Sequence, residues 1–171
     1  MKIPALKDLL RMLYFEKNNT QITIRDRSEP FEVFGTPRTV PYVPLATYLS
    51  SKVIKVSDYP VGDTAVGLEI QVPDNITYDF EYKNYCPDLE WVLSTFDLKL
   101  FDIRIDVDDG QTVTNVYSGK YSEIEYFAVA DILTGHVYSF DTESSDLEGN
   151  NILTVSVRKP SFIVYSRNGR Q

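Results

Sequence analysis

The segment Ile103-Arg104-Ile105-Asp106-Val107 gives the clearest indication of the architecture of this chain, because its pattern repeats that of Ile22-Thr23-Ile24-Arg25-Asp26. In both segments apolar and polar residues alternate, which is typical of a β-strand with one face turned to a core. Other elements recur around these two strands in the same order, at an offset of roughly 81 to 85 residues. The sequence therefore predicts an internal duplication.

Each copy is predicted to hold the same series of elements. An amphipathic helix comes first, from Leu6 to Leu13 and again from Leu89 to Phe96, because leucines recur on one helical face. A strand pair, a short helix and a second strand pair follow. The expected strands include 20–25, 31–34, 52–57, 66–72 and 102–107, and the expected turns include 35–37, 60–63 and 108–110. The first short helix is expected at Leu45–Leu49, after two prolines. The predicted fold class is α+β, with two tandem helix-strand-strand-short helix-strand-strand units and mostly antiparallel sheets.

The duplication divides the chain into four expected parts. Residues 1–76 form a near-neutral first unit, 77–87 an aromatic and acidic connector, 88–158 a strongly acidic second unit, and 159–171 a short basic tail. Units of about 70 residues are marginally stable alone, so the two are expected to share an interface. The connector rings Tyr78, Phe80 and Tyr82 either cover the seam between the units or form an exposed recognition strip.

The negative charge of the chain is concentrated in its second half. The net charge is -8; residues 1–85 hold 11 acidic and 10 basic residues, whereas residues 86–158 hold 14 and 4. A field of this sign repels phosphates and attracts basic protein surfaces. We therefore expect a basic protein partner and no direct binding of nucleic acid.

The expected location is the cytoplasm. The first residues contain no apolar run long enough for a signal peptide or a membrane span. Cys86 is the only cysteine, so no internal disulfide can form, which fits a reducing compartment.

The patterns that could indicate chemistry are weak. Asp102, Asp106, Asp108 and Asp109 precede a glycine as in a calcium loop, but the glycine falls one place too early, and a hairpin turn with a solvated acidic face accounts for the same residues. The single histidine, His136, and the single cysteine do not make an ordinary zinc site. We expect no cofactor and no enzymatic activity.

A magnesium-dependent nuclease is a third alternative. Pro87-Asp88 with Asp97-Leu98-Lys99, and Pro73-Asp74 with Glu81-Tyr82-Lys83, have the letters of the PD-(D/E)xK nucleases. So short a pattern arises by chance in an acidic chain. Asp88 is expected to cap the second long helix, and Asp97 to follow that helix in a loop.

Four segments resemble small accessory proteins of phages and mobile elements of Gram-positive bacteria. They are Lys7-Asp8-Leu9-Leu10, residues 20–26, Val116-Tyr117-Ser118-Gly119-Lys120 and Tyr121-Ser122-Glu123-Ile124. Several such proteins are anti-CRISPR inhibitors of the type II effector nuclease. The resemblance implies a phage or mobile-element protein that acts in a bacterial host cell as a monomer or dimer, on a nuclease that carries its guide RNA.

Nucleic-acid mimicry would give such an inhibitor its mechanism. A guide-directed nuclease holds nucleic acid in a positively charged channel, which an acidic protein face could occupy. The residues expected to form this face are Asp102, Asp106, Asp108, Asp109, Tyr121, Glu123, Glu125, Tyr126 and Asp131. The alternative is a phage structural or assembly module that self-associates through its sheets.

Overall fold

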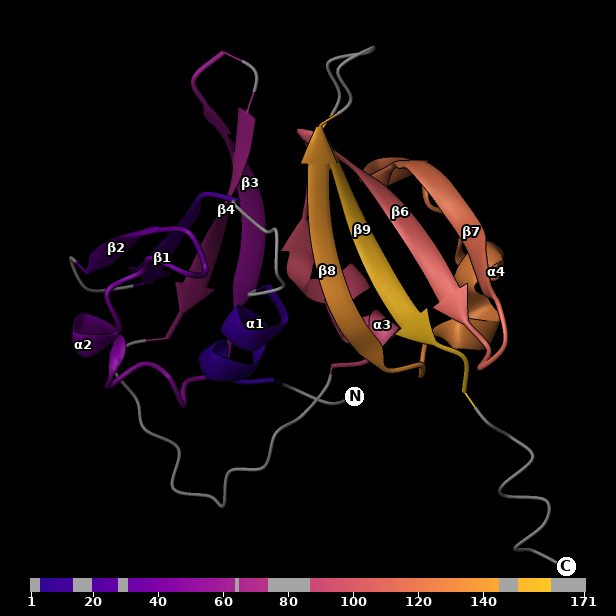
Figure 1. Cartoon of the computed structure of the whole chain (residues 1–171), viewed down its shortest axis with the longest axis horizontal. Helices are drawn as coiled ribbons and strands as arrows, with labels where there is room; N and C mark the ends of the chain where they lie inside the picture. Colours follow the sequence, from indigo (N-terminus) through magenta and orange to yellow (C-terminus); the bar gives the residue numbers. More distant parts are fainter. Residues whose placement is uncertain are drawn as a thin grey trace, which may run out of the picture.

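Two mixed β-sheets form the fold, one built mainly from the first copy and one from the second (Figure 1). The computed structural model describes residues 4–13, 20–27, 31–63, 65–73, 87–144 and 151–160. The first copy contains α1 (Leu6–Leu13), β1 (Ile22–Asp26), β2 (Glu32–Gly35), α2 (Tyr42–Leu45), β3 (Lys55–Val61) and β4 (Ala65–Val72). The second contains α3 (Leu89–Thr95), β5 (Phe96–Asp97), β6 (Phe101–Asp108), β7 (Val113–Lys120), η1 (Tyr121–Glu123), α4 (Tyr126–Val129), η2 (Ala130–Ile132), β8 (Val137–Ser144) and β9 (Asn151–Arg158). The predicted α+β class is confirmed.

The strand order is the same in both copies. The first sheet has the order β2-β1-β4-β3-β5 and the second β7-β6-β9-β8, so corresponding strands occupy corresponding places. Each sheet joins two antiparallel pairs through a central parallel pair, β1 with β4 and β6 with β9. The sheets are therefore mixed, because the first strand of one antiparallel pair lies beside the last strand of the other.

The duplication extends to the register of the strands. Ile22 lies beside Leu68 in the first parallel pair, and Ile103 lies beside Leu153 in the second. All four side chains are fully buried. The alternating isoleucines of the opening sequence pattern thus form the same part of the core in both copies, as expected from the period of a strand.

A glycine with positive φ ends the second strand of the first copy, and its counterpart lies near the end of the corresponding strand in the second. Gly35 has φ 156° and Gly119 has φ 152°, and each pairs with the first isoleucine of the neighbouring strand. A Cβ at Gly35 would lie 2.9 Å from the backbone nitrogen of Val40. Both the backbone angle and the close approach require glycine there. Gly35 thus belongs to β2 and not to the turn predicted at 35–37.

The two copies share one hydrophobic core. The ring of Phe96 stacks on Phe140 with centroids 5.4 Å apart and meets Trp91 edge-on at 5.9 Å. Phe96 also lies in β5, which leaves the second copy and pairs with β3 of the first sheet. Helix α1 contacts β8 across the same seam, and Figure 1 shows it between the sheets. The units thus share an interface, as expected.

Several other element boundaries differ from the prediction. Helix α2 begins at Tyr42, not at Leu45, and Pro44 is its third residue. Proline is tolerated there because the first N–H groups of a helix have no partner within it. Pro60 and Val61 extend β3 instead of forming a turn. Because β5 pairs with β3 only at Val56 and Ser57, the edge of β3 beside Pro60 is open, and a proline is tolerated at such an edge. Asp97 lies in β5, not in a loop.

The connector rings Tyr78, Phe80 and Tyr82, and Cys86, lie outside the described residues. In the part of the chain that the structure describes, every helix is too short or too polar to cross a membrane.

Candidate functional site

The predicted site residues divide between two surfaces of the second unit. Asp102, Asp106 and Asp108 alternate with buried apolar residues along β6, so they lie on the sheet face away from the core. Asp109 follows them in the β6–β7 turn, and the other five residues belong to the segment 121–131 after β7. The structure therefore does not bring all nine residues together on one face.

Basic neighbours partly neutralise the carboxylates on the β6 face. Nε of Arg104 lies 3.0 Å from Oδ1 and 3.2 Å from Oδ2 of Asp106, and Nδ2 of Asn115 donates to the same carboxylate at 3.0 Å. Asp102 pairs in register with Lys120 across β6 and β7. This face carries the Arg104–Asp106 ion pair and a lysine in register with Asp102, and not the uniform negative charge that mimicry of a phosphate backbone requires.

Asp108 and Asp109 shape the predicted hairpin turn. Oδ1 of Asp108 accepts the backbone N–H of Gly110 at 2.8 Å, and Oδ1 of Asp109 accepts those of Gln111 and Thr112, both at 2.9 Å. The backbone donors, Thr112 first and then Gln111, lower the pKa of Asp109. Both side chains thus stabilise the local backbone, and the predicted turn is confirmed.

An acidic aromatic surface forms where β7 leads into α4. We use this name for Glu123, Glu125, Tyr126, Phe127 and Asp131, all of which are exposed. The side chains of Tyr126 and Phe127 are 71% and 79% exposed. Large apolar residues exposed side by side typically mark an interaction surface.

The sequence analysis missed Phe127. The structure exposes this residue because α4 is one turn long and only its fourth residue, Val129, is buried. A helix of one turn cannot direct two adjacent large side chains and the fourth residue to the same core, since successive positions lie about 100° apart.

Tyr121 anchors this segment to the core. Its hydroxyl donates to the backbone oxygen of Leu93 in α3, and its ring is half-buried against the hydrophobic core. Burial raises the pKa of Tyr121, and the charge of Asp97 raises it further. Tyr121 is therefore a structural contact beside the acidic aromatic surface and not an exposed part of it.

Three of the predicted carboxylates act on one tyrosine. Burial raises the pKa of Tyr117, and the charges of Glu123, Asp102 and Glu125 raise it further. The Tyr117 hydroxyl donates to the backbone oxygen of Lys120 at 2.6 Å. The negative potential around the start of segment 121–131 is therefore contributed jointly by β6 and the loop that precedes α4.

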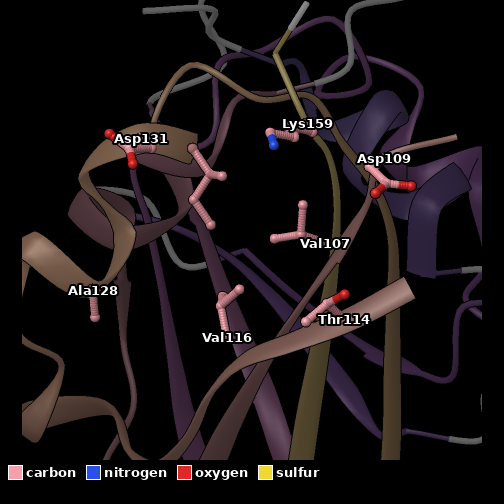
Figure 2. Close-up of a pocket in the computed structure, with 8 residues that line it drawn as sticks. Val107, Asp109, Thr114, Val116, Ala128, Asp131 and Lys159 are labelled. Atoms are coloured by element: carbon pink, nitrogen blue, oxygen red, sulfur yellow. The ribbon is translucent and has the colours of Figure 1, made fainter. Parts of the chain in front are cut away.

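A pocket of about 300 Å³ lies beside the acidic aromatic surface. Its lining residues come from β6, β7, α4, η2 and the chain after β9: Val107, Asp109, Thr114, Val116, Ala128, Asp131, Ile132 and Lys159. Figure 2 shows Asp131 and Asp109 on opposite sides of the pocket, with Lys159 between them on the rim. Apolar side chains form the interior, and the rim carries two carboxylates together with the cation of Lys159.

The residues of the first nuclease pattern have structural partners, and Asp74 and residues 81–83 of the second pattern lie outside the described residues. Oδ1 of Asp88 accepts the backbone N–H of Trp91 at 2.9 Å and caps α3, as predicted. Asp97 lies 3.6 Å from Nζ of Lys55, and the backbone N–H of Lys99 donates to Asp58. Within the described ranges, no three His, Cys, Asp or Glu side chains are grouped so as to hold a metal ion.

Comparisons with protein-family models, with curated proteins and with solved structures found no match for this chain. A proposal for its function therefore depends on the acidic aromatic surface and the pocket beside it.

Proposed function

We propose that this chain is a non-enzymatic binding protein that docks a basic protein partner on its acidic aromatic surface. The observation that carries the proposal is the exposure of Tyr126 and Phe127 side by side among three carboxylates. Aromatic rings are enriched at the centres of protein interfaces, and charged residues at their rims.

The two rings offer enough buried area to support binding. A Tyr or Phe side chain buries roughly 200 Å² when covered. About three quarters of each ring is exposed, so a partner that covered both would gain about 3 kcal/mol per ring before the entropy cost of association. The carboxylates of Glu123, Glu125 and Asp131 would mainly speed encounter with a basic surface and select against acidic ones.

The pocket beside the rings adds a place for one basic side chain of the partner. Val107, Val116 and Ile132 would contact its apolar stem, and its charged end would pair with Asp131, which lies on the opposite side of the pocket from Asp109, with Lys159 between them. Such a contact would orient the partner, since a hydrogen bond between a cation and a carboxylate is directional.

A type II CRISPR nuclease with its guide RNA is the partner class that the resemblance of the sequence favours. Such an enzyme presents many lysines and arginines along its nucleic-acid channel. Inhibition would then follow from occupation of those side chains by a protein of a phage or mobile element inside its bacterial host. The acidic aromatic surface suits this role better than the β6 face, where Arg104 and Lys120 accompany the carboxylates.

A binding and cleavage assay with charge-reversed variants tests the proposal. The immobilised chain is exposed to the purified nuclease–guide complex, and DNA cleavage is measured in parallel. The double variant Glu123→Lys/Glu125→Lys and the single variant Phe127→Ala should each lose most of the binding. The double variant Asp141→Lys/Glu143→Lys is the matched control, because it makes the same charge change at exposed positions of β8, at the other edge of the sheet.

The assay separates three outcomes. Binding that is lost only in the variants of the acidic aromatic surface, together with loss of inhibition, supports the proposal. Equal loss in the control would mean that net charge and not the acidic aromatic surface drives binding. If the chain binds other basic proteins but not the nuclease–guide complex, it is a docking protein whose partner is not a CRISPR nuclease.

A further inference from the structure

Helices α2 and α4 occupy corresponding places in the two units, α2 between β2 and β3 and α4 between β7 and β8. Both expose their first two residues: Tyr42 is 45% and Val43 87% exposed in α2, as Tyr126 and Phe127 are in α4. Both bury their fourth residue. The duplicated fold therefore presents the same kind of apolar projection twice.

The charge around the two projections is opposite. Tyr42 borders a pocket of about 420 Å³ that is lined by Lys7, Leu10, Arg11, Arg38, Tyr42 and Leu49, which we call the basic pocket. Three of these six side chains are cationic and none is acidic. The carboxylate of Asp8, 3.7 Å from Arg11, is fully buried and does not reach the surface. The corresponding position in the second unit carries Glu123, Glu125 and Asp131.

We propose that the acidic aromatic surface of one copy docks into the basic pocket of a second copy of this chain. The two surfaces match in chemistry, because three carboxylates around exposed rings face three cations around the apolar side chains of Leu10 and Leu49. A hollow of this volume lies within the range of pockets that hold an aromatic group. The occupant is therefore the α4 projection, with Phe127 toward the leucines and the carboxylates toward Lys7 and Arg38.

The positions of the two surfaces determine the kind of assembly. Figure 1 shows α2 and α4 near opposite ends of the long axis of the molecule, so one chain does not bring its own two surfaces together. When two different surfaces of the same chain bind each other, the copy at each end of the assembly keeps one surface unoccupied. Further copies can therefore add until the assembly closes into a ring. A series of oligomers is expected, and not a discrete dimer. This inference goes beyond the proposed function, although a basic partner would compete for the same acidic aromatic surface.

Sedimentation velocity over a wide range of protein concentration, at low and high salt, tests the inference. Two variants reverse one surface each: Glu123→Lys/Glu125→Lys makes both surfaces basic, and Lys7→Glu/Arg38→Glu makes both acidic. Each variant alone should remain monomeric. An equimolar mixture should associate again, because the native basic pocket of the first variant fits the native acidic aromatic surface of the second. Circular dichroism confirms that each variant is folded.

The expected result is a wild-type sedimentation coefficient that rises with concentration and falls with added salt, since exposed charge pairs are screened. Wild type that stays monomeric throughout, or charge-reversed variants that associate like wild type, would overturn the inference. Phe34 is 62% exposed on the edge strand β2. If Phe34→Lys abolishes association and the charge-reversed variants do not, the copies associate through the edges of their sheets instead. Monomeric wild type that still binds a basic partner through Glu123 and Glu125 would leave the proposed function standing.

Discussion

Replacement of Asp58 with alanine should destabilise the whole chain, because this one side chain joins the two units. Asp58 lies on β3, and its carboxylate accepts the backbone N–H groups of Lys99, Leu100 and Phe101 at N···O distances from 2.7 to 3.1 Å. These residues lead into β6, so a carboxylate of the first sheet holds the start of the second.

The magnitude follows from the surroundings of the three donors. A hydrogen bond to a charged acceptor contributes about 1.5 to 3 kcal/mol when water is excluded. Lys99 and Leu100 are exposed, so water can replace the lost acceptor and each bond contributes about 0.5 kcal/mol. Phe101 is buried and its bond contributes near the full amount. The expected loss for Asp58→Ala is about 3 kcal/mol, or a fall in Tm of about 6 to 12 °C for a chain of this size.

Urea denaturation followed by far-UV circular dichroism measures this loss. Asp58→Asn keeps one carbonyl acceptor and should lose about half as much. Asp63→Ala is the matched control, because Asp63 is exposed in the turn directly after β3. Hydrogen exchange of the Leu100 and Phe101 amides should accelerate in Asp58→Ala. A difference of less than about 0.5 kcal/mol between Asp58→Ala and Asp63→Ala would refute the reasoning, because ordinary surface substitutions vary by that much.

Three further outcomes are expected. Gly35→Ala should lower the free energy of unfolding by about 2 kcal/mol, and Gly62→Ala by about 1 kcal/mol. Both glycines have positive φ, but only a Cβ at Gly35 would meet backbone atoms. Urea denaturation of the two variants measures the difference. Burial raises the pKa of Tyr121, so the free energy of unfolding should be retained up to about pH 10 and fall at higher pH. Tyr121→Phe loses the hydrogen bond to Leu93, so it should be less stable at neutral pH and its stability should fall less steeply above about pH 10. An equally steep fall in the variant would contradict this. Phe127→Ser should change the unfolding free energy by less than about 0.5 kcal/mol, since the ring is mostly exposed, and a larger loss by thermal denaturation would show that it packs within the fold.

The core of each unit could be predicted because its signal is local. Ile22 and Ile24, like Ile103 and Ile105, alternate with polar residues, and this period alone places them on one face of a strand. The first long helix was predictable for the same reason, since the leucines of α1 recur at helical spacing. Asp88 could be predicted as a cap, because the capped N–H lies three residues away in the same chain segment.

The surroundings of the acidic residues could not be predicted in the same way. The sequence showed Asp106 as one carboxylate of an acidic strand, but Arg104 and Asn115 bind it in the folded chain. Which cation reaches a carboxylate depends on side-chain direction and on the β-bulge between Ile105 and Asp106, neither of which composition reveals. Net charge therefore predicts a basic partner, but it does not show which of the acidic residues have a cation beside them in the folded chain.

The duplicated α+β organisation follows from the sequence alone, because the spacing of apolar residues and the order of the elements can be read along the chain. Three features become evident only in the folded chain: β5 leaves its own unit for the first sheet, Asp58 binds the start of β6, and Phe127 projects into solvent. These features depend on how elements far apart in the sequence pack against one another. The local pattern of residues does not determine that packing.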